Sequence, residues 1–393
     1  MTRQEFDSSA AEQLLEILTE HGLDGLQEAM AILLNEAMKI ERSRFLGAGP
    51  YERAEDRRGY ANGFKDKTLK TRVGELALAI PQVRDLEPGT EGFYPKALER
   101  GTRAERALVC ALAEMYVQGV STRKVAAITE QLCGYEVTSS QVSRAAKTLD
   151  EQLQRWRERP LGVTPYLVLD ARYERVRHEG QVISTAVLIA IGVTEDGKRR
   201  ILGVSVKLSE AEAHWRDFLR SLKERGLEGI RLVVSDDHEG LRAAREAVFG
   251  SVPWQRCQFH LQRNAGAYVP RAEMRQEVAQ AIRAIFNAED RRGADEALEK
   301  TVNRYQKSAP QLAKWMETAI PEGLAIFAFP AAHRRRLRTT NALERLNEEI
   351  RRRTRVVRIF PNTDSLLRLA SAVLAEYDDD WETGRNYLNM RAE

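Results

Sequence analysis

The sequence has little of what would place the protein outside a reducing compartment or within a membrane. Only three of its 393 residues are cysteines, and Cys110, Cys133 and Cys257 are too few and too scattered for a disulfide framework. No apolar run approaches the roughly 20 residues that a membrane-spanning helix needs, and the first residues carry no apolar signal core. These absences predict a cytoplasmic protein that does not enter a membrane.

The chain as a whole has almost no excess of positive or negative charge, but one segment is strongly basic. The 61 Lys and Arg residues nearly cancel the 58 Asp and Glu residues, so the net charge is only +3. Between Arg334 and Arg358, however, ten arginines stand against three glutamates. A charge run taken alone is more often a solvated helix face, but an excess of this kind also suits phosphate groups. A polyanion is therefore the expected partner if the rest of the chain agrees.

The N-terminal part is expected to be helical and then to form a hairpin. Helical spacing of apolar residues predicts two helices within 10–45. The following segment, RRGYANGFKDKTLKTRVGELALAIPQVRD, predicts a short basic hairpin that turns at Val-Gly-Glu and stops at Pro81. Its candidate DNA contacts are Lys67, Lys70 and Arg72.

Residues 103–149 have the spacing of a helix-turn-helix. STRKVAAITEQL and TSSQVSRAAKTL predict two helices joined by the glycine-containing turn CGYEV, and Thr138 or Ser139 is placed to cap the second helix. An ordinary pair of packed helices fits this pattern about as well. The candidate DNA contacts in this region are Arg123, Gln141 and Arg144.

The pattern changes to strands after Pro160. Three strands in succession predict an antiparallel meander, and alternating helices and strands then follow, so we expect an open mixed sheet with helices on its faces. The first of these helices is predicted to begin with a capping box made by Ser209 and Glu212. Residues 271–330 are predicted to be helical throughout, with interruptions at Gly293, Pro310 and Pro321.

Three carboxylates stand out by their placement. Asp170 interrupts an otherwise apolar strand, where an unpaired charge would cost several kcal/mol. Asp236 ends a later strand, and we prefer it to Asp237 because successive strand residues point to opposite faces, although this leaves the choice open. Glu344 lies in the arginine-rich helix predicted to start near Thr339 or Thr340. Strand-end aspartates also cap turns and helical glutamates also form surface ion pairs, but three such acids at one point would hold two divalent cations.

Four ordered motifs make the sequence resemble a known family. VLDARYERVR, LVVSDDHEGL, WQRCQFHLQRN and RTTNALERLNEEIRRRTRVVRIFPN are similar to the first-aspartate, second-aspartate, Cys-x2-His and glutamate-helix segments of bacterial insertion-sequence transposases of the Mutator type. The resemblance extends upstream to the basic hairpin and downstream to DDDWETGRNYLNM. One departure is Asp237, where the family more often has a small residue.

This resemblance implies an α/β protein with an RNase H-like mixed sheet, flanking helices, an all-α insertion before the last catalytic helix, and a mainly helical N-terminal DNA-binding region. The implied regions are 1–100 for dimerisation and DNA binding, 101–160 with the helix-turn-helix, 161–270 and 333–393 as the two parts of the catalytic core, and 271–332 as the insertion.

The implied chemistry is cleavage of double-stranded DNA at terminal inverted repeats, followed by strand transfer into target DNA by a homodimer. Two Mg²⁺ (or Mn²⁺) ions per site would be held by Asp170, Asp236 and Glu344. The supporting residues are expected to be Cys257, His260, Asn341 and Arg345. Further backbone contacts are expected from Arg338, Arg351, Arg352 and Arg353.

Several alternatives remain open from the residues themselves. Cys257 and His260 would be half of a zinc site, but no second ligand pair is nearby. Two other roles are equally compatible with the sequence. Cys257 is a core residue and His260 makes a polar contact at a helix start, or His260 lies beside the reacting phosphate. A metal-dependent nuclease or resolvase without strand transfer would share the three acids. A helix-turn-helix regulator without catalysis would leave Asp170 and Glu344 unexplained.

Overall fold

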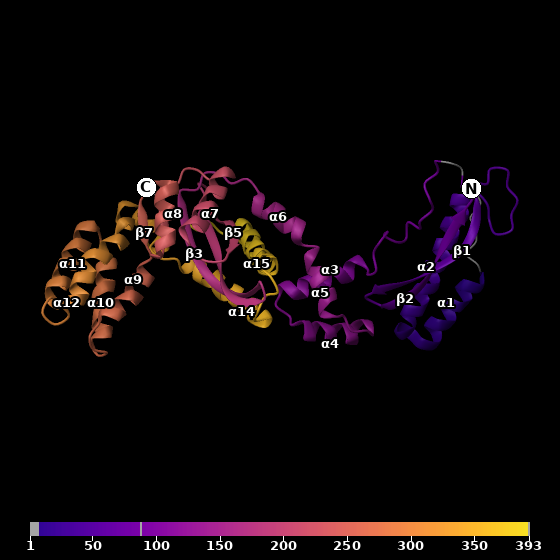
Figure 1. Ribbon diagram of the computed structural model, residues 1–393, viewed down its shortest axis with the longest axis horizontal. Coiled ribbons are helices and arrows are strands. Elements are labelled where there is room, and N and C mark those ends of the chain that lie inside the picture. The colour runs from indigo at the N-terminus through magenta and orange to yellow at the C-terminus, as the bar shows by residue number, and fades with distance from the viewer. Residues whose placement is uncertain (1–7, 87–88, 392–393) are drawn as a thin grey trace. The chain divides into compact units, whose positions relative to one another are not determined.

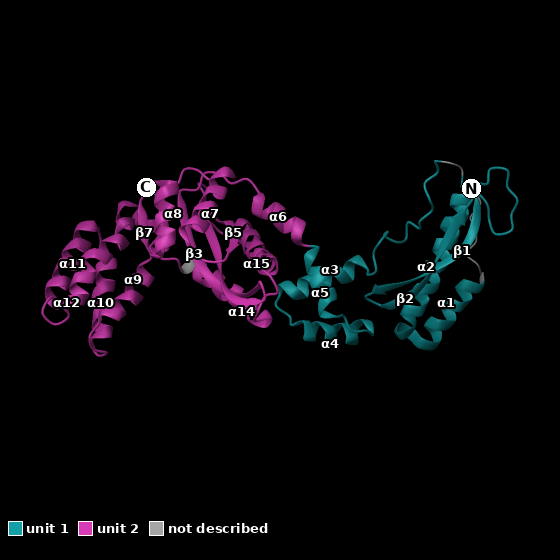
Figure 2. Cartoon of the chain, viewed as in Figure 1, with its two compact units in different colours: residues 1–148 teal, residues 149–393 magenta. Residues whose placement is uncertain are grey.

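The computed structural model describes residues 8–86 and 89–391, and of Ser8, Asn341 and Ala342 it describes the backbone only. The chain divides into two compact units, residues 1–148 and 149–393, each with its own core (Figures 1 and 2). The boundary falls inside the range 101–160. Among the described helices, none combines the length and apolar character needed to cross a bilayer.

The first unit begins with helices packed on a hairpin. Helices α1 (Ser8–His21) and α2 (Leu26–Leu46), joined by the 3-10 turn η1 (Gly22–Gly25), confirm the two predicted helices. Strands β1 (Tyr60–Thr71) and β2 (Gly74–Arg84) pair antiparallel. Alternate residues of β2 face α2, where Met38 is fully buried. Asn35 of α2 accepts a hydrogen bond from the Ala79 amide at 2.9 Å, so α2 also satisfies part of the open strand edge.

The hairpin itself is longer than predicted, and the stop at Pro81 is wrong. Strand β2 continues through Pro81 to Arg84, and Pro81 is paired with Phe64 beside a register shift at Ala61/Phe64. Proline is tolerated at such bulges and on edge strands because the N–H that it lacks is not needed by the ladder. A proline alone therefore did not mark the end of this strand.

The rest of the first unit is a small helical cluster. Its helices are α3 (Arg106–Val117), α4 (Thr122–Cys133) and α5 (Ser139–Lys147). Gly134 ends α4 in the left-handed conformation, at φ 71°. Thr138 caps α5 in a capping box with Gln141, which confirms the predicted cap. The buried residues Leu112, Val125 and Val142 join the three helices in one core.

The second unit is built on a five-stranded mixed sheet of order β5-β4-β3-β6-β7. Its strands are β3 (Tyr166–His178), β4 (Gln181–Val193), β5 (Arg199–Lys207), β6 (Leu232–Ser235) and β7 (Trp254–Arg256). The first three strands form the predicted antiparallel meander. Strands β6 and β7 are added in parallel, each after a crossover helix. The chain is thus a mixed α/β protein.

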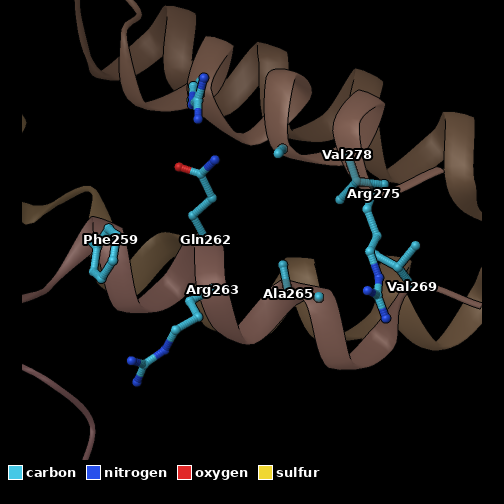
Figure 3. A pocket seen from close by; sticks show the side chains of 10 residues that line it. Phe259, Gln262, Arg263, Ala265, Val269, Arg275 and Val278 are labelled. Carbon is cyan, nitrogen blue, oxygen red and sulfur yellow. The ribbon is translucent and has the colours of Figure 1, made fainter. Parts of the chain in front are cut away.

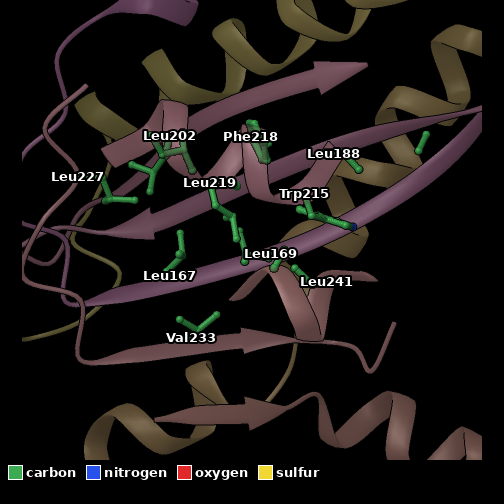
Figure 4. Close-up of a cluster of buried hydrophobic side chains, with 14 residues drawn as sticks. Leu167, Leu169, Leu188, Leu202, Trp215, Phe218, Leu219, Leu227, Val233 and Leu241 are labelled. Carbon is green, nitrogen blue, oxygen red and sulfur yellow. The ribbon is translucent and has the colours of Figure 1, made fainter. Parts of the chain in front are cut away.

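Helices cover both faces of this sheet. One face is covered by α7 (Glu212–Glu224) and α8 (Glu239–Phe249), and the other by α14 (Asn341–Val357) and α15 (Thr363–Thr383). Leu167 and Leu169 of β3 point to the α7 side, where Figure 4 shows them with Trp215 and Leu219 in the main core. Because side chains alternate along a strand, Asp170 points to the α14 side.

The start of α7 differs from the prediction. The helix begins at Glu212 after Ala211, and no side chain caps it. The Ser209 hydroxyl instead accepts from the Ala211 amide at 3.4 Å and lies 3.4 Å from His214 Nδ1. The predicted capping box of Ser209 and Glu212 is therefore wrong because Ser209 belongs to the preceding turn.

Between the sheet and α14 the chain is helical. It forms α9 (Gln258–Ala265), η2 (Gly266–Tyr268), α10 (Met274–Phe286), α11 (Arg291–Tyr305), α12 (Pro310–Ala319), η3 (Ile320–Gly323), η4 (Ala325–Ala328) and α13 (Ala331–Leu337). Pro310 begins α12 and Pro321 lies in η3, but the predicted break at Gly293 is wrong. Gly293 is the third residue of α11, and its amide donates to the Asp290 side chain that caps this helix.

Candidate active site

The candidate site lies where β3 and β6 run in parallel. Val168 pairs with Val234, and continuing this register by two residues brings Asp170 opposite Asp236. Both carboxylates thus leave neighbouring strands at the same level, and they interact electrostatically. Asp170 is only 7% exposed. A buried acid beside a second acid is the arrangement in which a cation binds favourably.

The surroundings of Asp170 disfavour its charged form. Burial first, and then the charge of Asp236, raise the pKa of Asp170 to about 7, while His260 acts in the opposite direction. A third acid, Glu210, is 8% exposed and adds to this effect. Burial also raises the pKa of Glu210, which His238 at 3.7 Å opposes. No sequence pattern indicated Glu210, which simply precedes a predicted helix.

Helix α14 is hydrogen-bonded to three alternate residues of β3, namely Asp170, Arg172 and Glu174. Asn347 Nδ2 donates to Asp170 Oδ2 at 2.8 Å, and the Arg172 guanidinium donates to the Asn347 carbonyl. The Thr354 hydroxyl donates to Glu174 Oε1 at 2.9 Å. The position of Asn347 next to Asp170 is therefore fixed by both its side chain and its backbone.

Glu344 lies on the same helix, three residues before Asn347, and thus on the same face. Its helix starts after Thr340, as predicted, and the fully buried Leu343 and almost fully buried Leu346 pack the helix inward. Glu344 itself is half-buried. The side chain of Asn341, a predicted supporting residue, lies outside the described part. Arg345 is exposed, and its charge acts on Arg199 and Tyr387.

The donor set fits a hard divalent cation only in part. Asp170, Asp236 and Glu344 offer the carboxylate oxygens that Mg²⁺ and Mn²⁺ prefer. Among the residues that the structure describes, however, no three Asp, Glu, His or Cys side chains are grouped so that they could hold one metal ion. The arrangement is thus a preformed pair of carboxylates, with Glu344 on the adjoining helix face.

Cys257 and His260 lie at the start of α9, beside this pair. Cys257 is fully buried, and the Thr340 amide and hydroxyl each lie 3.4 Å from its sulfur. Burial raises the pKa of the Cys257 thiol, but the interactions with His260 and Thr340 outweigh it, so the pKa is lowered overall. The neighbouring Cys257, and then Asp170 and Asp236, raise the pKa of His260 despite its burial. Cys257 thus connects α9 with the residue that precedes α14.

Asp237 has a different environment from Asp236. Its carboxylate lies 2.9 Å from Arg256 Nη1 and 3.3 Å from Arg242 Nη1. Glu322 of η3 binds the same two arginines, at 2.9 and 3.0 Å. This network of two acids and two arginines ties the ends of β6 and β7 to the helical insertion, and it gives Asp237 a structural role.

The arginine-rich segment is divided between exposed and internal side chains. Arg351 is exposed, but Arg353 is only 3% exposed and forms ion pairs with Glu349 and Glu376, both at 2.9 Å. Arg352 pairs with Glu349 at 2.6 Å, and Arg338 donates to the Asn287 side chain at 2.7 Å. Arg353, a predicted DNA contact, is therefore buried in a structural ion pair because it faces α15.

The predicted DNA contacts of the first unit are also partly used internally. Lys70 pairs with Glu75 at 2.9 Å, and Arg72 pairs with Glu105 at 3.3 Å. Lys67 donates to the Tyr94 hydroxyl at 3.1 Å. The amide oxygen of Gln141 accepts hydrogen bonds from Thr138 in the capping box. Arg123 and Arg144 are exposed on α4 and α5.

Comparison with known proteins shows the family of this chain. Residues 1–384 match the model of the family described as "Transposase, Mutator family". A transposase for insertion sequence element IS406 from Burkholderia multivorans is 62% identical over 375 residues, which cover 95% of each chain. The transposase for ISRM5 from Rhizobium meliloti is 48% identical, over 93% of this chain and 91% of the relative. The transposase for IS256 in transposon Tn4001 from Staphylococcus aureus is 38% identical, over 93% and 94%. The chain therefore belongs to the Mutator family of transposases.

Proposed function

We propose that this protein cleaves the terminal inverted repeats of an insertion sequence and transfers the freed strand ends into target DNA. The proposal applies to this chain what the names of its relatives say of them. The observation that carries the chemistry is the parallel register of β3 and β6, which sets the buried Asp170 beside Asp236 at the carboxyl end of β6. The mixed sheet with helices on both faces supports an RNase H-like catalytic core.

Asp170, Asp236 and Glu344 would hold Mg²⁺ or Mn²⁺, two ions per site, with Glu344 joining the carboxylate pair when DNA and metal are bound. The ions would supply charge stabilisation for an in-line phosphoryl transfer and lower the pKa of an attacking water or 3′-hydroxyl. The residues of the chain have the task of positioning. Asn347 holds the Asp170 carboxylate, and the contacts of Arg172 and Thr354 keep α14 against β3.

The test is an assay of purified protein on linear DNA that bears the ends of its element, with the products mapped to the nucleotide. We expect nicking and strand transfer that require Mg²⁺ or Mn²⁺ and that are lost in Asp170→Asn, Asp236→Asn and Glu344→Gln, while DNA binding persists. Glu348→Gln is the matched control because Glu348 is an exposed acid on the same helix. Retained strand transfer in Glu344→Gln would refute the role of this residue.

The same assay separates the alternatives. A nuclease or resolvase would release cut DNA and never join it, and a regulator would bind the ends without cutting them. The buried Asp170 beside the half-buried Asp236 favours a catalytic function over a regulator, because a DNA-binding protein without chemistry has no use for two neighbouring carboxylates.

A homodimer is also proposed, because two element ends must be brought together. Exposed apolar side chains on α1, η1 and α2 support a contact between two copies in the first unit; they are Leu15, Leu18, Leu23, Met30 and Leu33. The proposal is checked by light scattering after size-exclusion chromatography, where a Leu15→Glu, Leu23→Glu double variant should be monomeric.

A location in the bacterial cytoplasm, on the nucleoid when DNA is bound, would follow from the proposed transposase function.

A further inference from the structure

A cleft of about 310 Å³ lies between α9 and α10 in the second unit (Figure 3). Its lining includes the apolar side chains of Ala265, Val269 and Val278. Three arginines from the two helices also line it and are called the rim arginines below; they are Arg263, Arg275 and Arg283. Apolar side chains together with guanidinium groups suit a ligand with a flat apolar part and an anionic part.

The positive charge of this cleft is not neutralised from within the protein. Among the described residues, none of the three rim arginines forms an ion pair with a carboxylate. The neighbouring helix α11 differs, since Arg291 pairs with Asp295 at 2.9 Å and Arg304 pairs with Glu277. Guanidinium groups left without acids in a concave site are good partners for phosphate oxygens.

Phe259 connects this cleft with the candidate active site. Its side chain is 46% exposed and lines the cleft, and its ring lies edge-on to the ring of His260, with centroids 5.6 Å apart. A second cleft of about 180 Å³ shares Phe259 and Arg283 and reaches Thr339, two residues before α14 begins. The two clefts thus lead from the segment before Glu344 along α9.

We propose that these clefts bind a single-stranded segment of DNA next to the reacting phosphate. The rim arginines would take the phosphate groups, and Phe259 would stack on an unpaired base. A single strand is favoured over duplex because a space of about 310 Å³ is at the small end of single-ligand pockets. An exposed aromatic ring can also stack only on a base that has left the duplex stack. The inference rests on the proposed function, which supplies DNA as the ligand. It adds that the DNA is single-stranded and that the two clefts bind it.

The experiment measures binding of the full-length protein to a fluorescent single-stranded oligonucleotide and to its duplex, at several salt concentrations and without divalent ions. In the triple variant Arg263→Gln, Arg275→Gln, Arg283→Gln the logarithmic salt slope for single strands should fall by about 2, since each contact contributes about 0.7. The matched control replaces Arg291, Arg292 and Arg304 of α11 by Gln and should leave the slope unchanged.

Phe259 provides the second arm. Phe259→Ala should weaken single-strand binding about tenfold, and Phe259→Trp should restore it because stacking needs only an aromatic face. Circular dichroism melting of each variant shows whether it has folded. An unchanged slope in the triple variant, or an equal loss of single-strand and duplex binding in Phe259→Ala, would overturn the proposal. The binding assay contains no metal, so a negative binding result would not contradict the proposed cleavage. A negative cleavage result would likewise not contradict single-strand binding.

Discussion

At the scale of single residues, the hydrogen bond from Asn347 to Asp170 links the arginine-rich helix to the carboxylate pair. A hydrogen bond to a charged group contributes about 1.5–3 kcal/mol, and here it also sets the direction of the carboxylate. We therefore expect Asn347→Ala to lower the rate of metal-dependent nicking about 10- to 100-fold, measured on pre-cut element ends under single-turnover conditions. DNA binding should be unchanged. If the rate stays at that of Glu348→Gln, Asn347 has no positioning role.

The adjacent aspartates allow a second prediction at this scale, because one faces Asp170 and the other faces two arginines. Asp236→Asn should abolish nicking and leave the free energy of unfolding unchanged or raised, since it removes repulsion from Asp170. Asp237→Asn should keep nicking but lower the free energy of unfolding by about 1–3 kcal/mol, because Arg256 is buried and loses one of its two partners. Urea denaturation measures the stability of both variants, and the nicking assay measures their activity. Loss of nicking in Asp237→Asn together with loss of stability in Asp236→Asn would reverse the assignment.

At the scale of elements, much of the second unit could be predicted because its patterns are regular. The meander, the strand that ends just before Asp236 and the start of α14 after Thr340 all follow from alternation, apolar runs and helix-start residues. The predictions of a helix break at Gly293 and of a helix cap at Ser209 were wrong. Glycine and serine are each compatible with more than one local structure, so neither residue alone determines it.

The candidate site could be predicted only as far as neighbouring strands determine it. The parallel register brings Asp170 and Asp236 together, and helical spacing puts Asn347 on the face of Glu344. The hydrogen bond from Asn347 to Asp170 and the nearness of Glu210 depend on tertiary packing, which no sequence spacing shows. The sequence likewise could not show which arginines of α14 face inward, because the inward side chain of Arg353 is stabilised by Glu376 from another helix.

This division of α14 makes a prediction that separates adjacent arginines. Arg353→Gln should lower the melting temperature, because it removes a buried cation from between Glu349 and Glu376, and it should leave the salt dependence of DNA binding unchanged. Arg351→Gln should keep the melting temperature and reduce the logarithmic salt slope for duplex DNA by about 0.9, the contribution of one phosphate contact. A reduced slope in Arg353→Gln would mean that this side chain leaves its partners to bind DNA.

At the scale of the whole molecule, each unit has a core of its own, and the second depends on a buried acid. Asp378 of α15 is 1% exposed and binds Arg159 at 2.8 Å, Arg200 at 3.1 Å and the Ile201 amide at 2.7 Å. These contacts join the segment after α6 (Asp150–Glu158), strand β5 and helix α15. Removing Asp378 would take away a buried acid shared by two partly buried arginines, and breaking a buried ion pair typically costs about 3–5 kcal/mol.

We therefore expect Asp378→Ala to destabilise residues 149–393 selectively. Hydrogen exchange followed by mass spectrometry should show faster exchange in peptides from β3, β5 and α15, while peptides from α3 and α5 keep their protection, because the first unit has a separate core. Asp379→Ala is the control, since Asp379 is the exposed neighbour on the same helix. Equal loss of protection in both units would show that they unfold as one cooperative body, and the division at residue 148 would then have no meaning for stability.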